Sequence, residues 1–178
     1  MEVKIRPATS EDALLIATAV ANGIHDEPRI DEFNGYALSE DTLYSFRNAH
    51  IAEVDGKPVG CIISYDGAHF MEMAIRTFTF YADNEDNEDN AQALAGEYHI
   101  DTVWVKPEHR RQGIGAKLCE FAMSLRGTNR KVTLVVHPKE TENIRFYHGL
   151  GFKHDGEKRL GYNLMYKREF GIREDEKN

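Results

Sequence analysis

Long apolar segments are missing from this sequence. No run of apolar residues approaches the ~20 residues that a helix needs to cross a bilayer. The opening residues, MEVKIR, contain no apolar stretch of the kind that a secretory signal carries. We therefore expect a soluble protein with a cytoplasmic location and no membrane partner.

Cysteine is scarce, and its spacing suggests neither a metal site nor a disulfide framework. The chain has two cysteines, Cys61 and Cys119, each in a largely apolar segment. We interpret both as buried free thiols. The eight histidines include no H-x-x-x-H or H-E-x-x-H pair, so no metal site is expected.

Basic residues are in deficit. Lys and Arg together number 22 against 30 Asp and Glu, which gives a formal charge of −8. This balance argues against nucleic acid as a partner and favours cationic small molecules. With 178 residues and 41% hydrophobic content, the chain is long and apolar enough to fold as a single domain over residues 1–178.

The N-terminal residues carry strand and helix patterns in turn. Residues 3–6 alternate like a strand, and residues 13–21 have the apolar spacing of a helix that ends at an Asn-Gly pair. Residues 24–38 are irregular. Ser39, followed by acidic residues, predicts the start of a second helix.

A β-hairpin is the clearest local signal in the middle of the chain. An Asp-Gly pair predicts a tight turn between strands at 51–54 and 59–63. Residues 68–81 fit a helix, although Phe78 and Phe80 also fit a strand.

The second half of the chain alternates strands with helices. We expect strands at 98–105, 131–137 and 161–170 and helices at 114–125 and 141–147. There is no internal repeat and no linker-like change of composition. The order of elements predicts one layered fold of the α/β or α+β class.

Residues 82–90 are rich in Asp, Glu and Asn and have no periodic apolar face. They are interpreted as a solvated loop. The alternative is that their charge steers a cationic substrate, provided that the loop lies beside the site. A calcium loop is not expected, because no glycine stands at the turn position that an EF-hand requires.

A basic turn with two glycines precedes the helix at 114–125. Gly113 and Gly115 lack side chains, so the backbone can approach a ligand, and the free amides of the first helical turn favour an anion. Arg110 and Arg111 add charge-assisted hydrogen bonds. The turn therefore predicts a phosphate or pyrophosphate site; alternatively, the glycines only shape the turn and the arginines are solvated.

The turn matches neither of the two commonest phosphate loops. The sequence contains no G-x-x-x-x-G-K-[ST] motif. Leu118 stands where the dinucleotide fingerprint requires a third small residue. A different nucleotide-binding loop is therefore expected.

Two blocks resemble the GNAT N-acetyltransferase superfamily. Residues 110–115, RRQGIG, match its R/Q-x-x-G-x-G/A signature between a strand and a helix. Residues 143–147, NIRFY, followed by Gly151-Phe152, resemble its second block. The resemblance implies a mixed central sheet of about six to seven strands, flanked by helices, with the fourth and fifth strands splayed apart. Residues 66–96 depart from the family pattern and form a variable insertion before the fourth strand.

The resemblance also implies acetyl-coenzyme A as cosubstrate. Amides of the glycine turn would bind the pyrophosphate with help from the two arginines, and the open edge of the fourth strand would pair with pantetheine. A main-chain amide near Trp104 or Val105 would polarise the thioester carbonyl. The residues assigned to the cofactor in this way are Val103, Trp104, Val105, Arg110, Arg111, Gln112, Gly113, Ile114, Gly115, Ala116, Asn143 and Phe146.

Tyr147 matches the family tyrosine that donates a proton to the departing thiolate. A phenol suits this role because its usual pKa, about 10, lies above that of a thiol; the alternative is a core aromatic residue. The attacking amine must also lose a proton. We predict Asp101 as the base, with Glu97 second and His99 third, because period two places all three on one strand face. Each could instead be a surface polar residue.

The function implied is acetyl-coenzyme A-dependent N-acetylation of a primary amine by direct attack in a ternary complex, since no motif suggests an acyl-cysteine. The acidic charge favours a cationic small molecule such as a polyamine or an aminoglycoside. Alternatives are acetylation of a protein N-terminus or lysine and, from another class, a non-catalytic coenzyme A-binding regulatory module. A homodimer stays open as the assembly.

Overall fold

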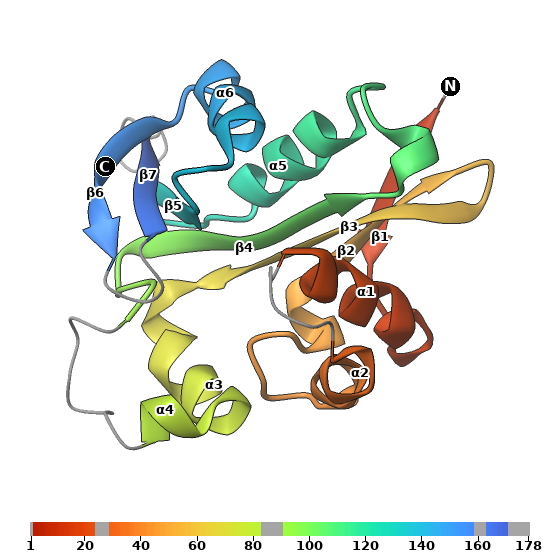
Figure 1. The fold of residues 1–178 in the computed structure, drawn as a ribbon, viewed down its shortest axis with the longest axis horizontal. Helices are drawn as coiled ribbons and strands as arrows, with labels where there is room; N and C mark the ends of the chain where they lie inside the picture. The colour runs from red at the N-terminus through yellow and green to blue at the C-terminus, as the bar shows by residue number, and fades with distance from the viewer. Residues whose placement is uncertain (1, 24–28, 83–90, 159–162, 171–178) are drawn as a thin grey trace.

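One seven-stranded sheet forms the centre of the protein (Figure 1). The computed structural model describes residues 2–23, 29–82, 91–158 and 163–170. The strands, in the spatial order β1-β2-β3-β4-β5-β7-β6, are β1 (Val3–Pro7), β2 (Ala49–Val54), β3 (Lys57–Asp66), β4 (Glu97–Val105), β5 (Lys131–Val136), β7 (Asn163–Glu169) and β6 (Lys153–Lys158). Only β4 and β5 are parallel; the other neighbouring pairs are antiparallel. The predicted mixed sheet is confirmed.

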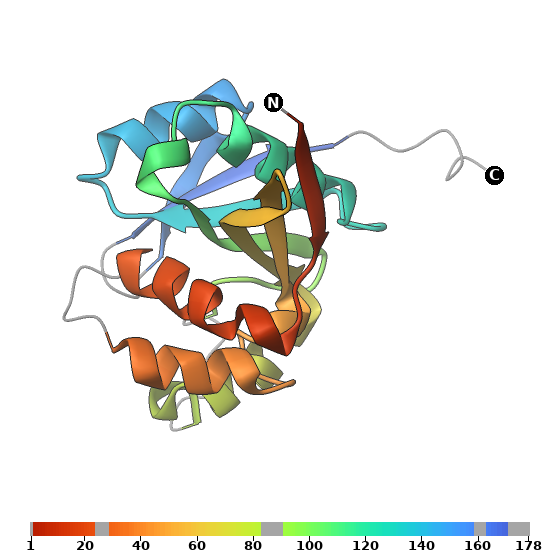
Figure 2. The same cartoon turned by 90° about the vertical axis from the view of Figure 1, so that its right-hand side faces the viewer.

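Helices cover both faces of the sheet (Figures 1 and 2). One face carries α1 (Ala13–Gly23), α2 (Ile30–Leu38), α3 (Phe70–Thr77) and α4 (Thr79–Ala82), and the other carries α5 (Ile114–Ser124) and α6 (Thr141–Gly149). No helix within the described ranges combines the length and the apolarity needed to span a membrane.

The two layers of helices enclose two cores, one on each face of the sheet. Cys61 and Ile63 of β3 pack with α1 and α2, whereas Ile62 between them packs with α5. This alternation follows from the period of two along a strand. Cys61 and Cys119 are both free and buried, as predicted.

The predicted hairpin is confirmed. Val54 and Lys57 form the last pair before the turn between β2 and β3. Asp55 and Gly56 both have positive φ, 50° and 72°, as a primed two-residue turn requires. Local turn chemistry therefore determines this part of the sheet.

The position predicted for the second helix is wrong. Helix α2 occupies residues 30–38, which were expected to be irregular, and it ends where a helix was expected to begin. The amide of Ser39 donates to the carbonyls of Gly35 and Tyr36, so this residue closes α2. Phe33 and Ala37, one turn apart, are buried, and their burial against the α1 layer offsets the low helix propensity of Gly35.

Among the residues that the structure describes, two α-helices lie between β3 and β4. Residues 70–77 and 79–82 form α3 and α4, separated by Phe78 in extended conformation. This decides between the helix and the strand that the sequence allowed. Residues 83–90 of the predicted acidic loop and residues 161–162 of the predicted last strand lie outside the described residues.

The parallel strands β4 and β5 are paired over only part of their length. Their register contains three pairs, Glu97 with Lys131, Tyr98 with Val132 and His99 with Thr133. From Ile100 onward β4 pairs with β3 alone. The splayed strands expected from the family resemblance are therefore present, and the separation opens the middle of the sheet.

Candidate active site

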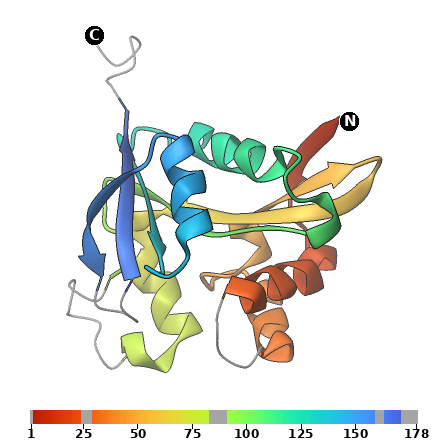
Figure 3. The same cartoon turned by 45° about the horizontal axis from the view of Figure 1, so that its top comes forward.

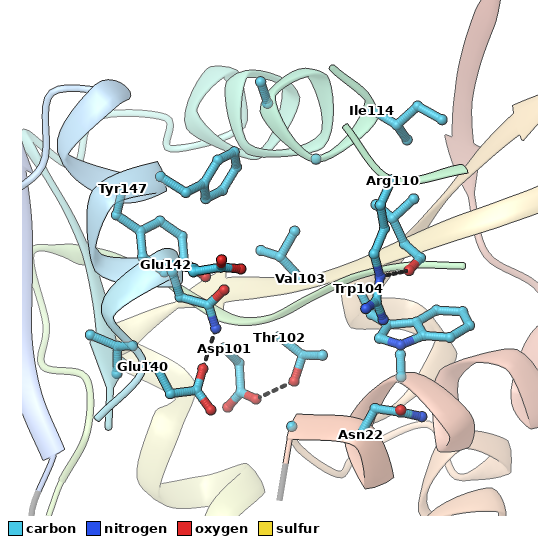
Figure 4. Close-up of a pocket in the computed structure, with 18 of the residues that line it drawn as sticks. Asn22, Asp101, Thr102, Val103, Trp104, Arg110, Ile114, Glu140, Glu142 and Tyr147 are labelled. Carbon is cyan, nitrogen blue, oxygen red and sulfur yellow. Dashed lines mark hydrogen bonds between the residues drawn. The ribbon is translucent and has the colours of Figure 1, made fainter. Parts of the chain in front are cut away.

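A cavity of about 1080 Å³ lies where β4 and β5 separate (Figure 4). Figure 3 shows the ribbon of the elements that surround it, with α6 in front of β4 in this view. The second half of β4 forms one wall, and the end of β5 with α6 forms the other. The turn after β4 and the start of α5 close one end, and the end of α1 closes another. Because β5 has left the ladder here, part of the backbone of β4 faces the cavity without a strand partner, and an extended ligand can pair with it.

Asp101 projects from an irregularity in β4. Ile63 pairs with Thr102 and Ser64 pairs with Ile100, so Asp101 is the extra residue of a β-bulge. Its Oδ2 accepts a hydrogen bond of 2.8 Å from the hydroxyl of Tyr65, and its Oδ1 accepts one of 3.0 Å from Thr102. Burial raises the pKa of Asp101, and these two hydrogen bonds oppose the rise.

The turn between β4 and α5 has the geometry of an anion site. Gly113 precedes the helix with φ of 79°, a left-handed conformation that only glycine adopts without strain. No side chain caps α5, so the amides of its first turn are free to bind a ligand. Arg110 adds positive charge here, and its Nε donates to the carbonyl of Val105 at 2.9 Å.

Helix α6 supplies the opposite wall. Its residues Glu142, Asn143, Phe146 and Tyr147 line the cavity. Glu140, just before the helix, also lines it, and its carboxylate accepts a hydrogen bond from the side-chain amide of Asn143. In Figure 4, Glu140 lies on the same side of the cavity as Asp101, far from Arg110.

Tyr147 is partly buried at the cavity wall, and the pKa of its phenol is strongly raised. Burial is the main cause, and the nearby Cys119 and Glu140 add to it. The phenol therefore keeps its proton throughout the neutral range. The centroid of its ring lies 5.2 Å from that of Phe146. Phe146 also packs close to Gly115, because a Cβ added to Gly115 would lie 3.5 Å from Cζ of Phe146.

A pair of exposed charges bridges the two walls. Arg111, from the glycine turn, and Glu142, from α6, approach within 3.9 Å. Both side chains are largely exposed, so solvent screens their attraction and the pair contributes little to stability.

Most of the predicted site residues meet at this cavity. Those that line it are Asp101, Val103, Trp104, Val105, Arg110, Arg111, Gly113, Ile114, Gly115, Ala116, Asn143, Phe146 and Tyr147. Trp104, whose orientation the sequence left open, lines the cavity and also packs against the core beside α1.

Three candidates do not reach the cavity. Gln112 points back to the carbonyl of Glu108. Glu97 accepts a hydrogen bond from the amide of Leu94, and His99 is fully buried with its Nδ1 3.0 Å from Thr133 Oγ1. Glu97 and His99 lie where β4 is still paired with β5, so no slot exists beside them.

Several lining residues were not predicted from the sequence. Tyr44, Gln92 and Glu140 come from segments with no recognisable motif. A weak signal existed only for Glu140, which lies three residues before Asn143 of the second block. Among the described residues, no group of three or more His, Cys, Asp or Glu side chains is placed to hold a metal ion.

The family model described as "Acetyltransferase (GNAT) family" matches residues 16–152 of the chain. No curated protein sequence matches it significantly.

Solved structures share the fold at low sequence identity. An N-acetyltransferase from Staphylococcus aureus Mu50 is 20% identical, with 92% of this chain and 98% of that chain covered and a TM-score of 0.72. The diaminobutyrate acetyltransferase EctA from Paenibacillus lautus, in complex with L-2,4-diaminobutyric acid and coenzyme A, is 17% identical, with 97% of this chain and 98% of that chain covered and a TM-score of 0.62. A chain of the NatC complex bound to Gag peptide and coenzyme A is 15% identical, with 96% of this chain and 100% of that chain covered and a TM-score of 0.62.

Proposed function

The chain belongs to the GNAT acetyltransferase family, and on this premise we propose that its cavity transfers the acetyl group of acetyl-coenzyme A to a primary amine of a cationic small molecule. The amine attacks directly in a ternary complex. The observation that carries the proposal is the meeting of the glycine turn, Asp101 and Tyr147 at one cavity in the open part of the sheet.

The residues at the turn fit coenzyme A. The amides at the start of α5 are uncapped, Gly113 has a positive φ directly before them, and Arg110 adds a cation. These groups would hold the pyrophosphate. The unpaired edge of β4 beside Val103 and Val105 would hold the pantetheine arm, and Asn143 lines the opposite wall.

Charge is distributed unevenly along the cavity, apart from Arg145 on α6 and the exposed pair of Arg111 with Glu142. Asp101 and Val105 are four residues apart on an extended strand, about 13 Å, and Arg110 is hydrogen-bonded to Val105. The cationic end therefore lies well away from the carboxylates of Asp101 and Glu140. Such an arrangement favours a phosphate at one end and an ammonium at the other, in agreement with the overall charge of −8.

The proposed chemistry assigns one role to each of three groups. Acetyl-coenzyme A supplies the acetyl group as a thioester. Asp101 accepts a proton from the incoming ammonium, directly or through water, so that the free amine can attack. Backbone amides near Trp104 and Val105 stabilise negative charge on the carbonyl oxygen, and Tyr147 donates a proton to the leaving sulfur.

Direct transfer is supported by the state of the two thiols. Neither Cys61 nor Cys119 lines the cavity. Burial raises the pKa of Cys119 to about 12 and that of Cys61 further, so neither is a thiolate nucleophile at neutral pH. Initial rates should therefore follow a sequential pattern; parallel lines in a double-reciprocal plot would contradict direct transfer.

A panel of acceptors of equal length tests the substrate class. It comprises a monoamine whose distal end is uncharged, a diamine, an amino acid with a distal carboxylate and a short peptide, assayed by release of free coenzyme A thiol. The diamine should exceed the amino acid in kcat/KM by about tenfold or more, and the difference should shrink as salt is added. A preference for the amino acid or the peptide would overturn the cationic small molecule as acceptor.

The cytoplasmic location and a homodimeric assembly stay predictions. The assignment of residues 1–178 to a single domain, with residues 66–96 as a variable insertion, also stays a prediction.

A further inference from the structure

Tyr65 is a buried residue that contacts the cavity only through Asp101. It lies on β3, its side chain is 4% exposed, and it does not line the cavity itself. Its hydroxyl donates to Asp101 Oδ2 at 2.8 Å. Because Asp101 is the extra residue of the bulge, the ladder between β3 and β4 gives it no direct partner, and side-chain hydrogen bonds must fix the carboxylate instead.

The ring of Tyr65 is held on two sides. Its centroid lies 6.3 Å from that of Phe70 and 5.7 Å from that of His99, both fully buried. Turning the hydroxyl away from Asp101 would disrupt this packing. The hydrogen bond to Asp101 is therefore preorganised by the core rather than formed by a mobile side chain.

The carboxylate has no cationic partner within the described part of the chain. Asp101 forms no ion pair with another described residue, and the two hydrogen bonds to it come from the neutral hydroxyls of Tyr65 and Thr102. The phenols of Tyr44 and Tyr81 sense its charge, and Glu140 lines the same cavity. The basic residue of this cluster is His99, two residues earlier on β4, whose ring packs against Tyr65 and whose Nδ1 lies 3.0 Å from Thr133 Oγ1.

We propose that Tyr65 is a positioning residue for the acetyl transfer: its hydroxyl fixes the Asp101 carboxylate at the bulge and favours the ionised form that receives the proton of the amine. This inference rests on the proposed function, in which Asp101 is the base. It adds a residue that touches neither substrate nor cofactor and that no sequence motif marks.

The electrostatic consequence has a definite sign. Burial raises the pKa of Asp101, and the hydrogen bond from Tyr65 is the larger of the two hydrogen bonds that lower it. Removing the hydroxyl raises the pKa further, because the ionised carboxylate loses a donor. Loss of one hydrogen bond to a charged group corresponds to about one pKa unit.

The test compares Tyr65→Phe with Tyr98→Phe. Tyr98 is a matched control: its buried hydroxyl is hydrogen-bonded to Ser64, next to Tyr65, and it does not line the cavity. The acid limb of kcat/KM should move up by about one pH unit in Tyr65→Phe, and kcat on the plateau should fall about threefold or more while KM for the amine changes little. Tyr98→Phe should leave the acid limb and the plateau unchanged.

Carbon NMR of the carboxyl group of Asp101 gives the same information without an activity assay. The carboxyl midpoint should rise in Tyr65→Phe and not in Tyr98→Phe. In the unmodified protein, the Cζ resonance of Tyr65 should follow the midpoint of Asp101, because the phenol senses the charge that it binds. This last measurement needs no variant to fold.

Asp101→Asn separates the two hypotheses. If that variant keeps the acid limb, Asp101 is not the base, and the proposed function needs another general base. The carboxyl midpoints measured by NMR then still test whether Tyr65 stabilises the ionised form of Asp101. If Asp101→Asn loses the acid limb but Tyr65→Phe changes neither the acid limb nor the carboxyl midpoint of Asp101, the proposed role of Tyr65 is wrong. The role of Asp101 as the base then stands.

Discussion

Arg110 donates a hydrogen bond from Nε to the carbonyl oxygen of Val105 at 2.9 Å, which ties the glycine turn to the end of β4. The bond uses one nitrogen of the guanidinium and leaves the other two for a ligand. The same side chain can therefore shape the turn and present charge to a phosphate. A lysine has three N–H donors on one nitrogen, so it lacks the planar fork that directs separate nitrogens at the two partners.

Arg110→Lys should consequently weaken coenzyme A binding although the charge is kept. We expect the dissociation constant to rise about tenfold, the size of one charge-assisted contact with its geometry lost. The kcat at saturating acetyl-coenzyme A should change much less, since Arg110 lies far from Asp101. Arg29→Lys, on an exposed ion pair at the start of α2, is the matched control. Equal affinities of the two variants for coenzyme A would show that Arg110 does not bind the cofactor.

Tyr147→Phe tests the general acid. Because burial raises the pKa of Tyr147, the phenol is protonated throughout the neutral range and available as a donor. Loss of the hydroxyl should lower kcat about 10- to 100-fold with coenzyme A affinity unchanged. Tyr98→Phe controls for the removal of a buried hydroxyl. Unchanged turnover in Tyr147→Phe would show that another group, or water, protonates the thiolate.

Asp101→Asn should reveal the cost of partly burying the Asp101 carboxylate. The pKa of Asp101 is raised above 3.8 in the folded protein, so the folded state holds this proton more firmly than the unfolded chain does. Stability due to this group therefore falls as pH rises from about 3.8 to the folded value, and stays lower above it.

The Asp101→Asn variant has no carboxyl group at this position, so it does not lose this stability as the pH rises. Its free energy of unfolding relative to the unmodified protein should thus increase with pH across this window, as measured by denaturant titrations at several pH values. Glu120→Gln, on the exposed side of α5, serves as the control. A relative stability independent of pH would contradict the raised pKa of Asp101.

Local chemistry explains which elements the sequence predicted. The Asp55-Gly56 turn fixes the hairpin through backbone preferences alone, and the glycine turn before α5 is marked by its own residues. Helix α2 was misplaced because its signal is burial of Phe33 and Ala37 against α1, a tertiary contact between two helices. Propensity alone could not reveal it.

The same distinction applies to the site. Residues within the two family blocks were predicted, and nearly all of them line the cavity. Glu97 was ranked beside Asp101 because both fit a period of two, but the cavity begins only where β5 leaves the ladder. Tyr65 and Tyr44 reach the site region through packing of β3 and of the segment after α2, which leaves no pattern in the sequence.

Calorimetric titration of coenzyme A tests the central claim most directly, with Gly113→Ala and Gly35→Ala as a matched pair. A Cβ would meet no atom within 4 Å at either glycine, but Gly113 has φ of 79° whereas Gly35 is helical. Alanine at 113 therefore strains only the turn, by about 1 kcal/mol or more, and should weaken binding about tenfold or more, while alanine at 35 should leave it unchanged. Absence of binding to the unmodified protein, or equal affinity in all three, would contradict the assignment of the glycine turn to coenzyme A.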